Sequence, residues 1–199
     1  MGRIVNAIEP HTEADPAALI LQLLTAYGNV VGRSAHWRVE ADKHHTNLFT
    51  VIVGQTAKGR KGTSLGYVNN LLQSVDSEWA SKRIMSGLAS GEGLIWQVRD
   101  PIMESVLDKK KGRAELVETD PGVSDKRLLV VEPEYARVLT VCERETNTLS
   151  AIIRQAWDTG DLRVLTKKQT VCATGAHISI IAHITVDELR RLLSDNAAA

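Results

Sequence analysis

A short glycine- and lysine-rich segment is the part of the sequence with the clearest chemistry. It runs from Gly54 to Ser64 and reads GQTAKGRKGTS. Glycines allow backbone N–H groups to curl towards an anion, and a following helix N-terminus favours negative charge. A lysine adds positive charge, and a Ser or Thr hydroxyl beside it is a ligand for Mg²⁺. The segment therefore predicts a site that binds phosphate together with Mg²⁺.

The register of this segment is open, because its spacing departs from the usual G-x-x-x-x-G-K-[ST] pattern. Gly54 and Gly59 are separated as the pattern requires, but Arg60 follows where lysine is expected. We assign the phosphate-binding lysine to Lys61, and Lys58 takes this role if the loop folds otherwise. A flexible basic loop that binds nothing is the alternative for the whole segment. The residues expected to bind phosphate are Gly54, Lys58, Gly59, Lys61, Gly62, Thr63 and Ser64.

The Mg²⁺ ion is expected to bind the hydroxyl of Thr63, with Ser64 as the alternative. A carboxylate is also needed nearby, and Glu132 directly follows the apolar run 128–131. Ligands of open α/β sheets lie at the carboxyl ends of the strands, where an acidic residue holds the Mg²⁺ shell or orients water. Glu134 is a nearby alternative for this role. Glu132 also has a simpler interpretation, as a carboxylate that interacts with the start of the next helix.

Two further polar residues are candidate catalytic groups. Glu92 lies in a Ser-Gly-Glu turn after a short predicted strand, a place from which a general base activates attacking water. Its alternative role is a carboxylate at a helix start. His183 ends an apolar run, where it would sense a γ-phosphate or couple it to a neighbouring subunit. A hydrogen-bonded structural histidine is the alternative for His183. The catalytic candidates are thus Glu92, Glu132 and His183.

The other histidines and the cysteines do not predict a metal centre. His44 and His45 are adjacent, but no second ligand pair follows at a suitable spacing, so we reject a metal site there. Cys142 and Cys172 lie far apart and form no C-x-x-C motif. They exclude a disulfide framework or a zinc ribbon and favour the reducing cytoplasm. We expect both cysteines to be small buried residues.

The elements that must position these residues alternate between strands and helices. Buried apolar strands that alternate with amphipathic helices indicate an α/β fold with a mostly parallel sheet. Residues 1–15 are polar and predict a loose N-terminal arm, followed by a single domain over residues 16–195. The spacing predicts helices over 17–31, 65–75, 90–98, 133–141, 148–157 and 189–193. It predicts strands over 37–39, 47–53, 82–85, 127–132, 162–165, 170–173 and 177–184, and a β-hairpin insertion with its tip at 109–112.

Composition narrows the class of protein. The chain has 199 residues, with 24 Lys and Arg against 24 Asp and Glu, and 43% hydrophobic residues. This apolar content is enough for a buried hydrophobic core, so the chain is not a disordered tail. Zero net charge argues against a protein that coats a polyanion without specificity. The longest apolar runs, 19–24 and 178–182, are far shorter than the roughly 20 residues that a membrane span needs. No basic-then-apolar leader is present, so we expect a cytoplasmic protein.

Five stretches of the chain together resemble a family of uncharacterised bacterial, phage and mobile-element proteins. That family carries a domain of unknown function and is similar to the RecA/RepA-type P-loop ATPases, which include hexameric helicases. The resemblance implies a RecA-like P-loop core, a Walker A segment at Gly54–Ser64 and a Walker B strand that ends at Glu132. It implies ATP and Mg²⁺ as cofactors, Glu92 as a catalytic residue and His183 as a strand-end sensor. The stretches are 54–64, 86–94, 120–132, 149–160 and 174–185.

The resemblance also implies a function and partners. We expect an ATP-binding protein and ATPase linked to DNA replication or mobile-element maintenance. The alternatives are a regulatory or adaptor module that binds nucleotide or nucleic acid without turnover, and a structural interaction domain. Lysines in 109–113 and 167–168 are candidate DNA contacts. A homo-oligomeric ring would take an arginine in trans from Arg137, Arg144 or Arg154. Family members continue beyond residue 199, so a fragment and a short relative with weak hydrolysis both stay open.

Overall fold

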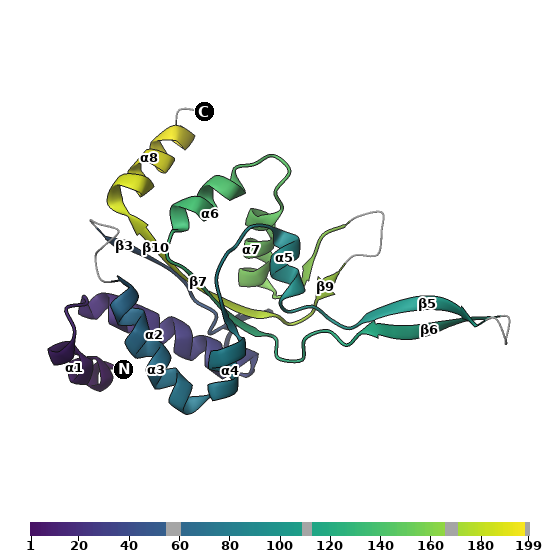
Figure 1. The fold of residues 1–199 in the computed structure, drawn as a ribbon, viewed down its shortest axis with the longest axis horizontal. Coiled ribbons are helices and arrows are strands. Elements are labelled where there is room, and N and C mark those ends of the chain that lie inside the picture. Colours follow the sequence, from purple (N-terminus) through teal and green to yellow (C-terminus); the bar gives the residue numbers. More distant parts are fainter. Residues whose placement is uncertain (55–60, 109–112, 166–170, 198–199) are drawn as a thin grey trace.

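The computed structural model describes residues 1–54, 61–108, 113–165 and 171–197. Its centre is a four-stranded parallel sheet with the strand order β3-β10-β7-β4 (Figure 1). This confirms the expected α/β class with a mostly parallel sheet flanked by helices. The strands of this sheet are β3 (Phe49–Gly54), β10 (His177–Thr185), β7 (Arg127–Glu132) and β4 (Ile84–Met85).

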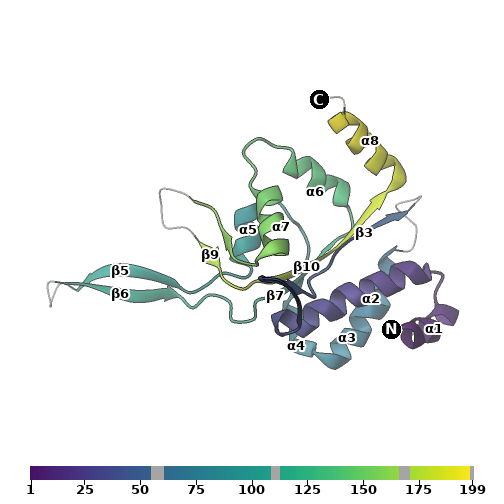
Figure 2. The same cartoon turned by 180° about the vertical axis from the view of Figure 1, so that it is seen from behind.

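Helices cover both faces of the sheet, as Figures 1 and 2 show from opposite sides. The first face carries α2 (Pro16–Val31), α3 (Lys61–Val75) and α4 (Ser77–Lys82), with α1 (Gly2–Ile8) against α2. The second face carries α5 (Gly91–Trp96), α6 (Tyr135–Cys142) and α7 (Leu149–Asp158). The last helix, α8 (Val186–Ala197), follows β10 and contacts α6.

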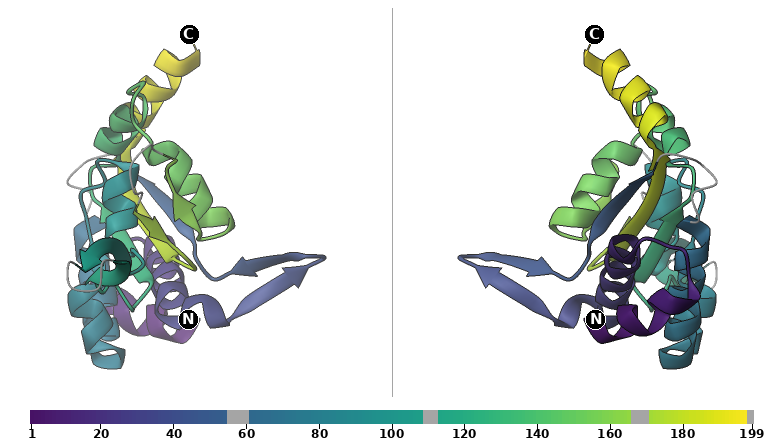
Figure 3. Two further views of the ribbon diagram at one scale, coloured as in Figure 1. Left: turned by 90° about the vertical axis from the view of Figure 1, so that its right-hand side faces the viewer. Right: turned by 90° about the vertical axis from the view of Figure 1, so that its left-hand side faces the viewer.

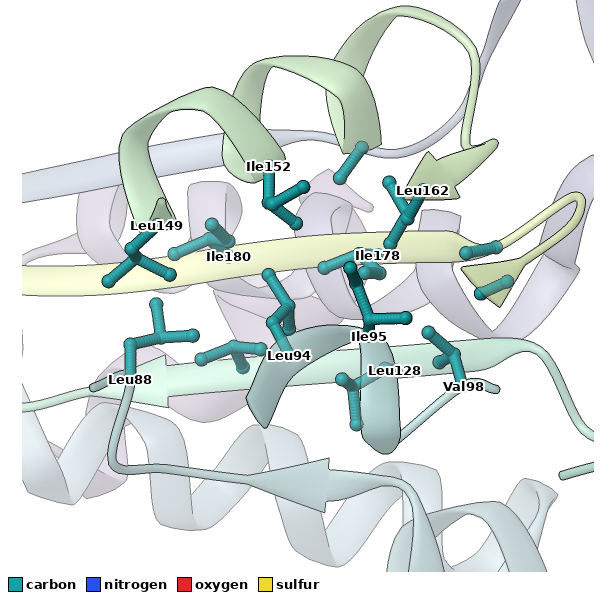
Figure 4. Close-up of a cluster of buried hydrophobic side chains, with 14 of the residues drawn as sticks. Leu88, Leu94, Ile95, Val98, Leu128, Leu149, Ile152, Leu162, Ile178 and Ile180 are labelled. Carbon is teal, nitrogen blue, oxygen red and sulfur yellow. The ribbon is translucent and has the colours of Figure 1, made fainter. Parts of the chain in front are cut away.

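The two faces are built by alternate residues of the same strands. Along β7, Leu128 and Val130 pack towards α5 and α7, whereas Leu129 and Val131 pack towards α2 and α3. This alternation follows from the period of two residues in a strand. On the second face, Ile178 and Ile180 of β10 complete the cluster with side chains from α5 and α7 (Figure 4).

Strand β10 lies inside the sheet, and strand β3 lies at its edge. Residues 177–184 of β10 are all buried, as expected for a parallel strand covered on both faces. The expectation that residues 47–53 form a buried strand is wrong in part. Val51 and Val53 remain 46% and 44% exposed, because no strand of the described chain lies beyond β3. An apolar, β-branched run does not distinguish an edge strand from a central one.

Three antiparallel strand pairs lie outside the parallel sheet. Two of them project from the body: the pair β1–β2 in Figure 3 and the pair β5–β6 in Figure 1. The arms of the expected β-hairpin insertion are confirmed as β5 and β6, and its tip, 109–112, lies outside the described residues. The strands are β1 (His36–Val39), β2 (Asp42–His45), β5 (Ile102–Asp108), β6 (Arg113–Asp120), β8 (Leu162–Arg163) and β9 (Cys172–Ala173).

The N-terminal segment differs from the expected loose arm. It contains α1 and the 3₁₀ turn η1 (Glu9–His11), and Val5 is buried at 4% exposure in the cluster under α2 and α3. A second 3₁₀ turn, η2 (Gly32–Ser34), ends α2. The short elements α1, α4 and β2 were not predicted, because runs of four to seven residues carry too few apolar positions to show a period. Cys172 is exposed and Cys142 is partly buried, so the expectation that both cysteines are buried is wrong.

A buried asparagine joins α2 to the sheet. The Asn29 side chain is fully buried and donates from Nδ2 to the carbonyl oxygens of Leu128 and His177, both at 3.0 Å. Its Oδ1 accepts from the indole N–H of Trp79 in α4 at 2.9 Å. A buried polar group is stable only when such partners are present. Asn29 thus fixes the position of α2 relative to β7, β10 and α4.

A glycine in the last turn of α2 is required by a close approach of the chain. A Cβ built on Gly28 would overlap the carbonyl oxygen of Thr46, whereas one on Gly66 in α3 meets nothing within 4 Å. In an open helix position, Gly→Ala stabilises by up to about 1 kcal/mol. We expect Gly28→Ala to destabilise the fold by about 2 kcal/mol, as overpacking does. Urea denaturation measures both variants, and Gly66→Ala is the matched control that should gain stability.

A buried histidine makes stability depend on pH. His177 is 1% exposed and donates from Nε2 to the Gly28 carbonyl oxygen at 2.9 Å. Burial lowers the pKa of His177 from 6.5 to about 4. Between these values the unfolded chain binds the proton and the folded chain does not, so stability falls as the pH falls from about 6.5 to 4.

The loss attributable to His177 approaches about 3 kcal/mol at the acid end of this window. We expect His177→Gln, which keeps a donor for Gly28, to remove this part of the pH dependence. Denaturation at pH values across the window measures the difference between the two proteins. Carboxyl groups with lowered pKa values contribute equally to both, so identical pH slopes would contradict this role of His177.

Candidate functional site

The carboxyl ends of the three strands β3, β10 and β7 meet at one edge of the sheet. Thr185 of β10 is in register with Gly54 of β3, and Ala182 is in register with Glu132 of β7. From this edge the chain leaves in two directions: α3, after β3, packs against α2, whereas α8, after β10, contacts α6. A crevice between neighbouring strands whose following helices diverge in this way is where open α/β sheets bind ligands.

A cavity of about 610 Å³ lies at this edge, and we call it the edge pocket. Leu65 of α3 forms one wall, the segment after β7 forms another, and the end of β10 forms the floor. A capping box begins α8 here, since Thr185 and Glu188 exchange hydrogen bonds. The lining residues are Leu65, Val131, Pro133, Glu134, Ala136, Arg137, His183, Ile184, Thr185 and Glu188.

The glycine- and lysine-rich segment joins β3 to α3. Its described residues Gly54 and Ser64 line a separate cavity of about 430 Å³, which residues of α2 and β3 also line, and they do not line the edge pocket. Gly54 is the last residue of β3, and Lys61 begins α3, one turn before Leu65. The structure gives only the backbone for 61–63, within the first turn of α3. Ser64, the alternative hydroxyl ligand, is fully buried. Two of the expected phosphate-binding residues, Lys58 and Gly59, lie outside the described residues.

The carboxylate of Glu132 is buried and bonded within the protein. Its side chain is 2% exposed, and Oε1 accepts from the backbone N–H groups of Gly87 and Leu88, both at 2.6 Å. Its Oε2 lies 3.4 Å from the guanidinium of Arg137. Glu132 therefore holds the loop after β4 against the end of β7. Glu134, the alternative acid, is exposed and lines the edge pocket.

The other two catalytic candidates lie in different places. His183 lines the edge pocket at 3% exposure, and its Nε2 is 3.1 Å from the side-chain nitrogen of Gln22 in α2. Glu92 is exposed in the first turn of α5 and accepts from the Thr148 hydroxyl at 3.0 Å. It does not line the edge pocket. The fold thus brings His183 and Glu132 to the same edge, and it separates Glu92 from the pocket lining.

Sequence reasoning did not single out two groups that matter at this edge. Gln22 is fully buried beside His183, and nothing in the spacing of α2 distinguishes it from an exposed polar residue. Arg137 was one of three arginines that the sequence could not separate. Its place one turn into the helix that follows Glu132 is the signal that would have selected it, since short strand–helix connections keep such residues at the carboxyl edge.

The described side chains of the edge pocket carry more negative than positive charge. Arg137 is the one Lys or Arg among the described residues that line it, beside the carboxylates of Glu134 and Glu188. In the part of the chain that the structure describes, no group of three or more His, Cys, Asp or Glu side chains could hold a metal ion.

Comparisons with known proteins do not identify the chain. A scan against protein-family models and a search of curated proteins both find no match. Over the described ranges, no helix combines the length and apolar character that crossing a membrane requires.

The contacts of Glu132 predict the effect of removing its carboxylate. We expect Glu132→Ala to lower the free energy of unfolding by about 3 kcal/mol, because it leaves the buried N–H of Leu88 and the partly buried N–H of Gly87 without their acceptor. Amide hydrogen exchange at Gly87 and Leu88 should accelerate in the same variant. The exposed neighbour Glu134 supplies the control, and Glu134→Ala should change stability by less than about 0.5 kcal/mol. Equal stability of the two variants would exclude this structural role.

Proposed function

We propose that the protein binds Mg²⁺-ATP in the edge pocket and is a P-loop ATPase of the RecA type. One observation carries this proposal: the glycine- and lysine-rich segment connects β3 to α3 at the edge where the pocket lies. A strand, a glycine-rich loop and a helix in this order are what a phosphate-binding loop requires. The edge pocket supplies the adjacent space that the rest of the nucleotide needs.

The dimensions of this edge suit a nucleotide. α3 spans Lys61–Val75, long enough for its aligned peptide dipoles to favour negative charge at its N-terminus. The pocket volume of about 610 Å³ falls in the usual range for small-molecule sites. In this proposal Lys61 neutralises the β- and γ-phosphates, and Thr63 holds Mg²⁺. Apolar contact with the base or ribose would come from Leu65, Val131 and Ile184.

The charge of the pocket favours the magnesium complex over free ATP. A free triphosphate carries several negative charges, so Glu134 and Glu188 would repel it. The single positive charge of Arg137 offsets only one of these two carboxylates. Bound Mg²⁺ would offset two of the negative charges of the ligand. We therefore expect binding to depend on Mg²⁺.

A second candidate function is nucleotide binding without rapid turnover. It is favoured by the partners that the catalytic candidates already have: Glu132 bonds Gly87 and Leu88, His183 lies beside Gln22, and Glu92 accepts from Thr148. Hydrolysis requires at least one of them to release its partner and orient water. A role in DNA replication or mobile-element maintenance rests on the family resemblance. The lysines expected to contact DNA, at 109–111 and 167–168, lie outside the described residues.

Thermal melting with and without Mg²⁺-ATP tests the proposed site. Ligand at about 100 times its Kd adds about 2.7 kcal/mol, which raises the Tm of a protein of this size by about 5 to 10 °C. We expect this rise in the wild type, its loss in Lys61→Ala, and its loss when EDTA removes Mg²⁺. Lys82→Ala is the matched control, because Lys82 is an exposed lysine on α4.

No rise at millimolar Mg²⁺-ATP in the wild type would contradict nucleotide binding. A rise that persists in Lys61→Ala but disappears in Lys58→Ala would move the lysine assignment and keep the site. Phosphate release measured on the same samples then separates the two candidate functions.

A further inference from the structure

We propose that Arg137 binds the terminal phosphate of the nucleotide in the same chain, by leaving Glu132. This inference rests on the proposed function, because it concerns a ligand of the edge pocket. It differs from the expectation that Arg137, Arg144 or Arg154 acts in trans on a neighbouring subunit. Three observations support the inference. Arg137 lines the edge pocket, its hydrogen bond to Glu132 is long, and Glu132 has other hydrogen-bond partners.

Arg137 is positioned by a well-packed helix. Val138 and Val141 on the same helix, α6, are buried in the core under the second face of the sheet. The backbone of Arg137 is therefore fixed, while its side chain lines the edge pocket and remains 48% exposed. Because the helix is fixed and the arginine side chain is half exposed, the guanidinium can reach a ligand in the pocket without movement of the fold.

The guanidinium is held weakly in the absence of a ligand. Among the described residues its one side-chain contact is with Oε2 of Glu132, at 3.4 Å. Charge-assisted hydrogen bonds of this type are normally about 2.7 to 2.9 Å long, so the pair is far from its optimum. Phosphate oxygens match the planar fork of arginine in two-point geometry and carry more charge than one carboxylate oxygen. A phosphate in the pocket therefore competes for Arg137 effectively.

Glu132 has hydrogen-bond partners other than Arg137. Its Oε1 accepts from the backbone N–H groups of Gly87 and Leu88, both at 2.6 Å. Transfer of Arg137 to the ligand leaves these two bonds in place. The loop after β4 therefore stays attached to β7 whether or not the pocket is filled.

The structure separates Arg137 from the other two arginines. Arg144 lies in the exposed segment after α6, and Arg154 lies on the exposed side of α7. Neither lines the edge pocket. Arg144 and Arg154 are matched controls, since each is an exposed arginine close to Arg137 in the sequence.

Isothermal titration calorimetry with Mg²⁺-AMP-PNP and Mg²⁺-ADP tests this inference on the whole chain. We expect Arg137→Gln to bind Mg²⁺-AMP-PNP at least tenfold more weakly than the wild type and Mg²⁺-ADP within twofold of it. Arg137→Lys, which keeps the charge but not the fork, should lie between the two. Arg144→Gln and Arg154→Gln should match the wild type for both ligands. Urea denaturation of Arg137→Gln should show unchanged stability, which a purely structural ion pair with Glu132 would not.

The outcomes separate this inference from the proposed function. Unchanged Mg²⁺-AMP-PNP affinity in Arg137→Gln would overturn the role of Arg137 and leave nucleotide binding standing. Weakened affinity in Arg144→Gln or Arg154→Gln, with Arg137→Gln unchanged, would assign the arginine to a neighbouring subunit. A wild type that binds neither ligand would overturn the inference and the proposed function together.

Discussion

The burial of β10 on both faces is the constraint on which the other elements depend. Residues 177–184 have no face towards solvent, so both sides of this strand must be covered. The backbone of a strand buried in this way also needs hydrogen-bonding neighbours on both edges, and β3 and β7 supply them. Helices α2 and α3 cover one face and α5 and α7 cover the other. The buried side chain of Asn29 then fixes how α2 lies over β7 and β10.

This arrangement determines where polar side chains can gather. The interior of the sheet is mostly apolar, and its buried polar side chains His177 and Ser179 are bonded to α2, so further polar groups gather where the strands end. Glu132 and His183 are the buried polar residues nearest the carboxyl ends of β7 and β10. Each has a protein partner: two backbone N–H groups for Glu132 and Gln22 for His183. His183 is therefore a hydrogen-bonded group in the lining of the edge pocket, whereas Glu132 does not line it.

The long periodic elements of the fold could be predicted from the sequence. The strand predicted over 127–132 is β7, and the helix predicted over 17–31 is α2. Burial of such apolar patterns leaves few alternative secondary structures for these segments. The edge position of β3 could not be predicted, since exposure of Val51 and Val53 depends on which strands pair. The order of strands along the sheet is likewise a long-range property that no local pattern encodes.

The candidate site could be predicted only in part. That His183 and Glu132 lie at one edge follows from the rule that parallel strands end together. The separation of Glu92 could not be foreseen, because the length of the segment after β4 decides how far α5 lies from the pocket. Arg137 could not be chosen among the three arginines from the sequence, because the packing of α6 decides which side of this helix lies towards the edge pocket.

Hydrogen–deuterium exchange with and without Mg²⁺-ATP shows whether the edge pocket binds this ligand. Binding there should slow exchange in residues 61–65, 131–137 and 183–188 and leave β5 and β6 little changed. These segments are distant in sequence, so their joint protection would locate the ligand at the pocket. Unchanged exchange in all three, or protection confined to another part of the chain, would exclude binding at this edge.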